Sequence, residues 1–231
     1  MADREACLVD VYHTLVSSDF PAYMAEMAEG AGITAEAWAD GYRQFGLAFR
    51  LGQVSKAEGF ARILRAAGVE PRPDLVRALV DLDLELLVRN SPPYDDALPF
   101  LRALRGRGIN IAIVSNCSEH TRDLLEAIGV AALADTLVLS YEVGVQKPSP
   151  EIYYYALDRL GVAAGRALFV DDQPSYCAAA AELGITAVQI VRGDPDGKVP
   201  AADTTVVRSL TEVEPMLTGS ASDPRPETGR R

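Results

Sequence analysis

The segment Cys7-Leu-Val-Asp-Val-Tyr-His-Thr-Leu15 is the most informative stretch of the chain. Its apolar run leads into Asp10, a pattern typical of a buried strand with a carboxylate at its carboxyl end. Open α/β sheets place their chemistry beyond the carboxyl ends of their strands. An aspartate there can act as a nucleophile and form a covalent intermediate. Taken alone, however, an aspartate after a strand more often caps a turn.

Three later segments place polar residues at comparable points. The first is an apolar run ending in a serine and an asparagine, and the third is an apolar run ending in two acids. The second carries a lysine just before an expected helix start, with Ser149 as its cap and Pro150 in its first turn. The three segments are Ile109-Asn-Ile-Ala-Ile-Val-Ser-Asn116, Lys147-Pro-Ser-Pro-Glu-Ile-Tyr153 and Ala167-Leu-Phe-Val-Asp-Asp172.

Strand-like and helix-like patterns alternate along most of the chain, which is typical of a parallel sheet covered by helices on both faces. The expected strands cover residues 6–11, 109–114, 136–140, 167–171 and 186–191. The expected helices between them cover residues 96–106, 119–128, 150–160 and 174–183. The sequence therefore predicts an α/β, Rossmann-like core made of residues 1–15 and 93–217.

Residues 16–92 interrupt this alternation with a block that has only helical patterns. Amphipathic helices are expected near 19–30, 35–50, 55–67 and 72–89, so this block is predicted to form a separate helical subdomain. Near the end of the chain, Ser209 and Glu212 have the spacing of a capping box for a last short helix. Residues 218–231 are rich in glycine, serine, proline and charge, which predicts a disordered tail.

Together, the four segments resemble the motifs of the haloacid dehalogenase superfamily, which contains dehalogenases and many phosphatases. The resemblance extends from about residue 7 to about residue 191. It implies a Rossmann-like core with a helical cap inserted between the first and second motifs, over the active site. One hinge of this cap would be residues 91–94, and the other would follow Leu15.

The resemblance also implies roles for individual residues. Asp10 would be the nucleophile, and Thr14 would orient it through a hydrogen bond. Ser115 and Asn116 would hold the transferring group, while Lys147 would neutralise developing charge. Preorganised charge stabilisation of this kind usually contributes more to catalysis than any other single effect.

A magnesium site is implied for a phosphatase of this superfamily. Its ligands would be Asp10, the backbone carbonyl of Tyr12 and Asp172, with Asp171 in the outer sphere. Oxygen ligation is what Mg²⁺ requires. The alternative is that the two adjacent acids only cap a helix, since acids favour helix starts.

Two residues depart from the phosphatase pattern. Tyr12 stands where phosphatases usually carry a second aspartate as general acid and base, and His13 stands where a glycine is usual. A tyrosine there resembles the 2-haloacid dehalogenases, whose halide leaves without a proton. The fourth motif resembles that of phosphatases instead, because such dehalogenases need no metal and carry neutral small polar residues where this chain has Asp171 and Gln173. Loss of a positioned acid costs about 10²–10⁴ in rate.

Other side chains leave alternatives open. His13 could donate the missing proton, or it could only line the pocket entrance; a substrate with an acidic leaving group would need no donor. Arg43, in the helical block, could bind an anionic group of the substrate, as a cap arginine does in dehalogenases, or it could lie on a solvated helix face. Tyr12 is expected to contact the substrate. His120 is expected to be solvated or to cap a helix.

Composition and net charge limit the kinds of molecule that the protein is expected to bind. The chain has 231 residues, 48% of them hydrophobic, which is enough for an α/β core and a small accessory domain. A net charge of −11 argues against nucleic acid or an anionic membrane, but it allows a small anionic substrate. No apolar stretch approaches the roughly 20 residues of a membrane span. The acidic N-terminal residues are not those of a signal peptide.

The three cysteines form no metal-binding pattern. They are expected to be reduced and mostly buried in a cytoplasmic protein. The oligomeric state cannot be read from the sequence.

We therefore expect a hydrolase, and in the first place a magnesium-dependent phosphatase of a small phosphorylated metabolite. The alternatives are a metal-independent 2-haloacid dehalogenase and a scaffold of this family with little turnover that is used for binding.

Overall fold

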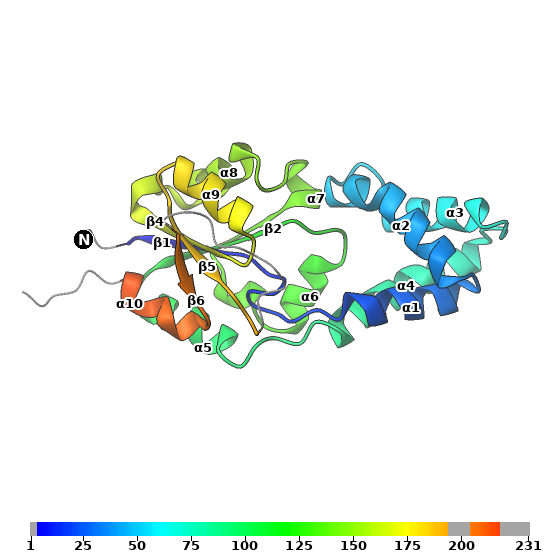
Figure 1. The fold of residues 1–231 in the computed structure, drawn as a ribbon, viewed down its shortest axis with the longest axis horizontal. Helices are drawn as coiled ribbons and strands as arrows, with labels where there is room; N and C mark the ends of the chain where they lie inside the picture. The colour runs from blue at the N-terminus through cyan, green and yellow to red at the C-terminus, as the bar shows by residue number, and fades with distance from the viewer. Residues whose placement is uncertain (1–3, 194–203, 218–231) are drawn as a thin grey trace, which may run out of the picture.

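The structure is a computed structural model and describes residues 4–193 and 204–217. The strands of these residues form a single parallel sheet in the order β3-β2-β1-β4-β5-β6 (Figure 1). Their bounds are β1 Ala6–Val9, β2 Asn110–Ser115, β3 Thr136–Leu139, β4 Ala167–Asp171, β5 Thr186–Ile190 and β6 Thr205–Val207. In the central strand, Cys7 pairs with Ile111 of β2 and Leu168 of β4. The polar residues that follow β1, β2 and β4 therefore meet at one edge of the sheet.

Both faces of the sheet are covered by helices, as the sequence predicts. Helices α5 and α6 lie on one face with α10, and α8 and α9 lie on the other (Figure 1). Successive residues of β1 alternate between the two buried clusters, with Cys7 on one side and Leu8 on the other. Burial on both sides explains why the strands read as unbroken apolar runs. The bounds are α5 Ala97–Gly106, α6 Thr121–Ala127, α8 Pro150–Leu160, α9 Pro174–Glu182 and α10 Glu214–Leu217.

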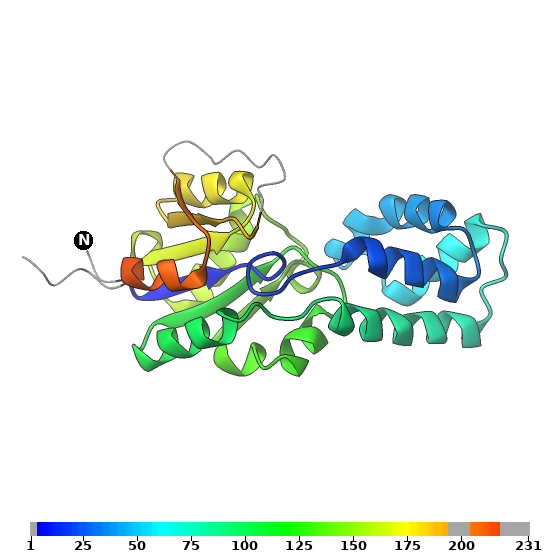
Figure 2. The ribbon, with the colours of Figure 1, turned by 60° about the horizontal axis from the view of Figure 1, so that its bottom comes forward.

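Residues 16–92 contain only helices, and we call this segment the helical insert. Its helices are α1 Phe20–Ala31, α2 Ala35–Arg50, α3 Lys56–Ala66 and α4 Pro73–Arg89. The side chains of Asp19, Thr34 and Ser55 cap the first three by accepting from backbone amides three residues on. The helices share a hydrophobic core of their own around Trp38 and Phe60. Both views place the insert at one end of the sheet (Figure 2).

Two adjacent chain segments connect the insert to the sheet. The amide of Ser17 donates to the carbonyl of Pro92 at 3.0 Å, and Val16 bridges to Pro93. A second contact joins the loop after α2 to α7, Ser140–Val143. Gly52 has a φ of 64°, and a Cβ on it would lie 2.0 Å from the carbonyl oxygen of Tyr141. Only glycine allows this approach.

The C-terminal part differs from the prediction in one element. Strand β6 was not expected, because it has only three residues and two of them are exposed, so it shows no alternation of apolar and polar residues. The capping box of Ser209 and Glu212 is confirmed, although it begins the 3₁₀ turn η3, Leu210–Glu212, rather than an α-helix. Two further 3₁₀ turns are η1 Ala131–Leu133 and η2 Ala164–Arg166. The predicted tail, 218–231, lies outside the described residues.

The three cysteines are free and buried. Across residues 4–193 and 204–217, no helix has both the length and the apolar character that crossing a membrane would require.

Candidate active site

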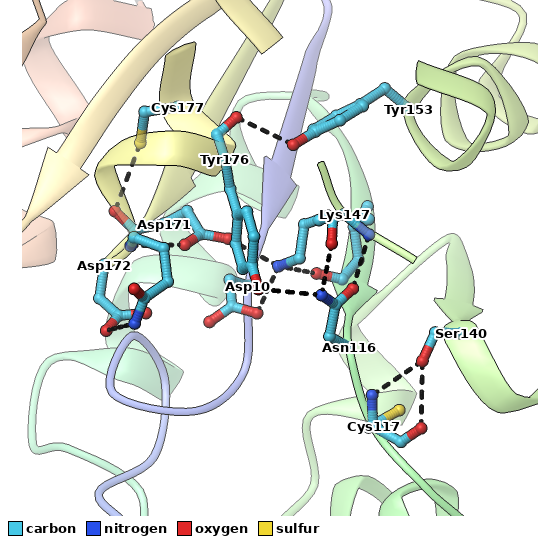
Figure 3. Close-up of polar contacts among 12 residues, drawn as sticks. Asp10, Asn116, Cys117, Ser140, Lys147, Tyr153, Asp171, Asp172, Tyr176 and Cys177 are labelled. Atoms are coloured by element: carbon cyan, nitrogen blue, oxygen red, sulfur yellow. Dashed lines mark hydrogen bonds and ion pairs between the residues drawn. The ribbon is translucent and has the colours of Figure 1, made fainter. Parts of the chain in front are cut away.

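The site is built around the buried ammonium group of Lys147, which lies in the loop between α7 and α8 (Figure 3). Its Nζ donates to Asp10 Oδ1 at 2.6 Å, to Asp171 Oδ2 at 2.6 Å and to the carbonyl of Val114 at 2.8 Å. Burial alone would lower the pKa of Lys147, but the charges of Asp10 and Asp171 outweigh it and raise that pKa. The lysine is therefore permanently charged between the two aspartates.

Three carboxylates surround this one lysine. Oxygen atoms of Asp10, Asp171 and Asp172 all lie within 4.8 Å of one another, and all three residues are buried. Burial raises the pKa of Asp10, against the opposing effect of Lys147. Burial also raises the pKa of Asp171 to about 7. Three carboxyl groups thus share one ammonium group, and a further cation would favour their ionised forms. Their oxygen donors suit a hard divalent cation such as Mg²⁺.

The two acids of the fourth motif have different surroundings. Asp171 ends β4, and each of its oxygens accepts a hydrogen bond, one from Lys147 and the other from the amide of Gln173 at 2.7 Å. Asp172 accepts from the side chain of Gln173 at 2.9 Å. Helix α9 begins at Pro174, directly after these residues. The turn between β4 and α9 therefore fixes both carboxylates beside Asp10.

The predicted hydrogen bond from Thr14 to Asp10 is not formed, and Asp10 Oδ1 accepts from Lys147. The hydroxyl groups of Thr14 and Ser115 are both buried, and neither has a hydrogen-bond partner among the described residues. An unsatisfied buried hydroxyl costs about 1–3 kcal/mol. Thr14 follows β1 and Ser115 ends β2, so two such hydroxyls at this edge of the sheet favour a ligand that accepts hydrogen bonds.

The side chain of Asn116 is bonded to the backbone of the loop that carries Lys147. Its Oδ1 accepts from the backbone amide of Lys147 at 2.7 Å, and its Nδ2 donates to the carbonyl of Lys147 at 2.8 Å and to the Tyr176 hydroxyl at 3.2 Å (Figure 3). This differs from the expectation that Asn116 holds the transferring group. Both polar atoms of the side chain are engaged, so in this arrangement it positions Lys147.

A cavity of about 370 Å³ lies between this edge of the sheet and the helical insert. Tyr12 and His13, which follow Asp10 in sequence, line its core side. The Tyr12 hydroxyl shares a hydrogen bond with Thr121 Oγ1 at 3.0 Å, and burial raises the pKa of Tyr12. His13 is exposed and has a φ of 60°. The other lining residues are Ser18, Asp19, Phe20, Tyr23, Tyr42, Gly46, Phe49, Arg50, Lys56, Asp83, Leu86, Leu87, Asn90, Ser91, Asn116, Cys117 and Ser118.

Arg43 does not line the cavity. Its side chain is 75% exposed and forms an ion pair with Asp40 at 3.0 Å, so the solvated alternative describes it correctly. The face of α2 toward the cavity carries Tyr42, Gly46 and Phe49, spaced as i, i+4 and i+7. Arg43 lies about 100° away from Tyr42 around the helix. The number of residues between Asp10 and Arg43 does not show on which face of α2 the arginine lies.

A second polar cluster was not predicted, and it joins the insert to the core. Lys56 Nζ donates to Asp83 Oδ1 at 2.9 Å, and the Tyr23 hydroxyl donates to the same oxygen. His120 Nδ1 lies 2.8 Å from Asp83 Oδ2. The hydrogen bond to Asp83 raises the pKa of His120. His120 is the N-cap residue of α6, as one of the two alternatives expected, but its side chain is bonded to Asp83 and makes no capping hydrogen bond to the helix.

One signal for this cluster was present in the sequence. Leu79, Asp83 and Leu86 follow the i, i+4, i+7 spacing of a buried helix face. A carboxylate in that stripe predicts a buried partner, because a buried charge needs one. The identity of the partners, Lys56 and His120, has no comparable local signal.

Comparisons with known proteins agree with this geometry. Residues 4–184 match the family model of haloacid dehalogenase-like hydrolases. A glyceraldehyde 3-phosphate phosphatase of Methanopyrus kandleri is 32% identical over 149 residues, which cover 64% of each chain. An (S)-2-haloacid dehalogenase 4A of Burkholderia cepacia is 29% identical over 224 residues, which cover 92% of this chain and 94% of that one. The crystal structure of a dehalogenase, 27% identical, superposes with a TM-score of 0.66 over 95% of this chain and 99% of its own.

Proposed function

The chain belongs to the haloacid dehalogenase-like hydrolase family, and within it we propose that this hydrolase is a magnesium-dependent phosphatase of a small phosphorylated metabolite. Relatives of the chain include both phosphatases and 2-haloacid dehalogenases. The choice between the two activities therefore depends on the residues of the site.

The observation that carries the proposal is the charge of the carboxylate cluster. Oxygen atoms of Asp10, Asp171 and Asp172 converge within 4.8 Å, and Lys147 forms ion pairs with two of these residues, Asp10 and Asp171. Like charges this close raise one another's pKa and oppose ionisation of the nucleophile. A divalent cation bound by Asp10 and Asp172 would remove this conflict. When bound, Mg²⁺ would neutralise charge on the transferring phosphoryl group.

The contacts of the two acids support distinct roles for them. Both oxygens of Asp171 already accept hydrogen bonds from Lys147 and Gln173. This supports Asp171 as an outer-sphere residue, and Asp172 stays a predicted direct ligand. The backbone carbonyl of Tyr12 stays a predicted third ligand.

The side chains would carry out the reaction in two displacements. A carboxylate oxygen of Asp10 attacks phosphorus, and the bond from phosphorus to the ester oxygen breaks, so that the alkoxide leaves with the electron pair and takes a proton from water. A second water then attacks phosphorus and gives up a proton, the bond from phosphorus to Asp10 breaks, and phosphate departs with the Asp10 carboxylate restored. Lys147 stays charged throughout and offsets the negative charge of the phosphoryl oxygens. The buried hydroxyls of Thr14 and Ser115 are candidate donors to those oxygens.

Metal-independent dehalogenation of 2-haloacids is the second candidate, and Tyr12 favours it. A tyrosine in place of a carboxylic acid suits a halide, because a halide leaves without a proton. The dehalogenase of B. cepacia also matches this chain over nearly its whole length. A metal-independent dehalogenase, however, would have no second cation to offset the charges of Asp171 and Asp172 beside Asp10.

A substrate panel separates the two candidates. The purified protein is assayed on phosphate monoesters and on 2-chloropropionate, each with Mg²⁺ and with excess chelator. We expect phosphate release that requires Mg²⁺ and is lost in Asp172→Asn. A matched control is Asp158→Asn, which removes an exposed carboxylate of α8 and should keep full activity. Chloride release in excess chelator, with no hydrolysis of any phosphate ester, would overturn the proposal.

A further inference from the structure

An arginine that follows β5 is bonded to the loop that carries the nucleophile. Arg192 lies two residues after the end of β5, and its Nη2 donates to the backbone carbonyl of Thr14 at 2.8 Å. The two residues are 178 positions apart in the chain, so only the folded sheet brings them together. Thr14 follows Asp10 by four residues, and its buried hydroxyl has no partner among the described residues. Arg192 therefore acts on a residue whose side chain is left open for a ligand.

A second set of contacts fixes the guanidinium group itself. Its Nη1 donates to Asp96 Oδ2 and its Nη2 to Asp96 Oδ1, both at 2.8 Å, and the side chains of Arg192 and Asp96 are only 12% and 16% exposed. Asp96 is the N-cap residue of α5, and its Oδ2 also accepts from the backbone amide of Leu210 at 2.8 Å. A bidentate pair of this kind adds geometric specificity to the attraction of the charges. The donor to the Thr14 carbonyl is thus held in place from the core.

The same guanidinium group also contacts one of the segments that connect the helical insert to the sheet. It lies 4.1 Å from the ring centroid of Tyr94, within the range of a cation–π contact. The backbone amide of Tyr94 donates to the carbonyl of Leu15 at 2.9 Å. Arg192 therefore contacts both the segment that leaves the sheet after the nucleophile and the segment that returns to it.

The loop after Asp10 leaves one of its carbonyls to be bonded from outside. The amides of Thr14, Leu15 and Val16 all donate to the carbonyl of Val11, at 3.3, 2.8 and 3.0 Å. The carbonyl of Thr14 accepts from Arg192 instead. Since the carbonyl and the hydroxyl belong to the same residue, a shift of this peptide group would also move the Thr14 hydroxyl.

From these contacts we propose that Arg192 is a positioning residue of the hydrolase, which orients the Thr14 hydroxyl toward the transferring group by holding the Thr14 carbonyl. This inference rests on the proposed function, in which that hydroxyl is a donor to the phosphoryl oxygens. A lysine could not replace the arginine. Its ammonium group is a point charge without the planar fork that bonds both oxygens of Asp96 and stacks on the ring of Tyr94.

A double-mutant cycle on kcat tests whether Arg192 acts through Thr14. Arg192→Lys keeps the charge beside Asp96 and removes the planar fork, and Thr14→Val removes the hydroxyl at nearly the same volume. With the best phosphate ester and Mg²⁺, Thr14→Val should lower kcat by about 10²-fold, as loss of one positioned donor does. Arg192→Lys should lower kcat by about 10-fold, because a small misplacement near the reacting group is costly. In the Thr14→Val background, Arg192→Lys should lower kcat by less than about twofold, because the group that it positions is already absent.

The matched control is Arg105→Lys. Arg105 Nη1 also donates to a backbone carbonyl, that of Leu133 at 3.1 Å, and to a carboxylate, that of Asp135 at 3.2 Å. Strand β3 begins one residue after Asp135, so this pair lies at the amino ends of the strands, across the sheet from the site. Arg105→Lys should leave kcat unchanged. Thermal unfolding of every variant verifies that it remains folded.

A second variant keeps the test independent of one substitution. Asp96→Asn retains the shape of the side chain but weakens its pair with Arg192, and it goes through the same cycle with Thr14→Val. It should lower kcat in the native background and have little further effect once the Thr14 hydroxyl is gone. This cycle decides the question if Arg192→Lys does not fold.

The possible outcomes separate this inference from the function on which it rests. A loss of kcat that is equally large in the native and Thr14→Val backgrounds would overturn the inference and leave the phosphatase intact, because Arg192 would then act on the segments that connect the insert. Unchanged kcat in folded Arg192→Lys would likewise overturn it. If the native protein hydrolyses no phosphate ester in Mg²⁺, the phosphatase is wrong, and the inference with it.

Discussion

Two buried lysines, Lys147 in the core and Lys56 in the helical insert, are alike in burial and differ in the charge around them. Both ammonium groups lie 5.3–5.5 Å from aromatic ring centroids. Lys147 is bonded to two carboxylates, and a third lies within the same cluster. Lys56 is bonded to Asp83, which also accepts from Tyr23 and pairs with His120.

The comparison separates a site from a structural link. Around Lys147 three carboxyl groups share one ammonium group, and the buried hydroxyls of Thr14 and Ser115 lack partners among the described residues, so this cluster is incomplete by itself. Around Asp83 one carboxylate is surrounded by donors from α1, α3 and the turn before α6. That cluster is complete, and it fixes the insert to the core. Substitutions in the two clusters should therefore have opposite consequences for activity and for stability.

The largest effect is expected for Asp10→Asn. An amide cannot replace the attacking carboxylate, so phosphate release should fall by about 10⁴-fold or more. The fold should persist, because Lys147 keeps Asp171 as its ion-pair partner. Steady-state assays and circular dichroism on the same preparation measure both properties. Activity within tenfold of the native protein would exclude Asp10 as the nucleophile.

Matched substitutions of the two lysine partners should separate stability from activity. Asp83→Asn leaves the buried charge of Lys56 uncompensated and should lower the free energy of unfolding by about 3–5 kcal/mol. Asp171→Asn leaves Lys147 paired with Asp10. It should lower the free energy of unfolding by no more than about 1.5 kcal/mol, while it impairs phosphate release. Urea unfolding of the metal-free proteins gives both values. Equal destabilisation by the two changes would contradict the distinction.

A smaller effect, which depends on pH, is expected for His120→Ala. The hydrogen bond to Asp83 raises the pKa of His120 above its ordinary 6.5, and the pKa of Asp83 itself is lowered. The histidine therefore contributes stability that is fully present below about pH 6.5 and is lost as the pH rises through its raised pKa. His120→Ala should lower the free energy of unfolding by about 1–2 kcal/mol near pH 6, and by less near pH 9. A cost that does not change with pH would mean that His120 stays neutral.

Much of the fold could be predicted because its signals are local. The strand runs, the helix periodicity of residues 16–92 and the start of α8 after Ser149 each depend on neighbouring residues. The convergence of Asp10 and Asp171 followed from the rule that the carboxyl ends of parallel strands meet at one edge of the sheet. Lys147 lies in a loop, and only the resemblance to the family implied its place in the site. Short β6 lacked such a pattern.

The insert side of the site could not be predicted in the same way. Which face of α2 turns toward the core depends on how the insert packs against the sheet, so Arg43 was indistinguishable from Tyr42 as a cavity residue. The partners of Asp83 come from three distant segments, and no local spacing joins them. Asn116 was recognised as a site residue, but its hydrogen bonds to the Lys147 backbone required the folded loop.

Calorimetric titration with Mg²⁺ tests most directly the claim that the Lys147 cluster is incomplete and takes a divalent cation. The native protein and the surface control Asp158→Asn should each bind one ion, and Asp172→Asn should lose that binding while remaining folded. Magnesium should also raise the melting temperature of the native protein, because the ion binds the folded state. Unchanged binding in Asp172→Asn, or no binding by a native protein that hydrolyses its substrate, would contradict the account.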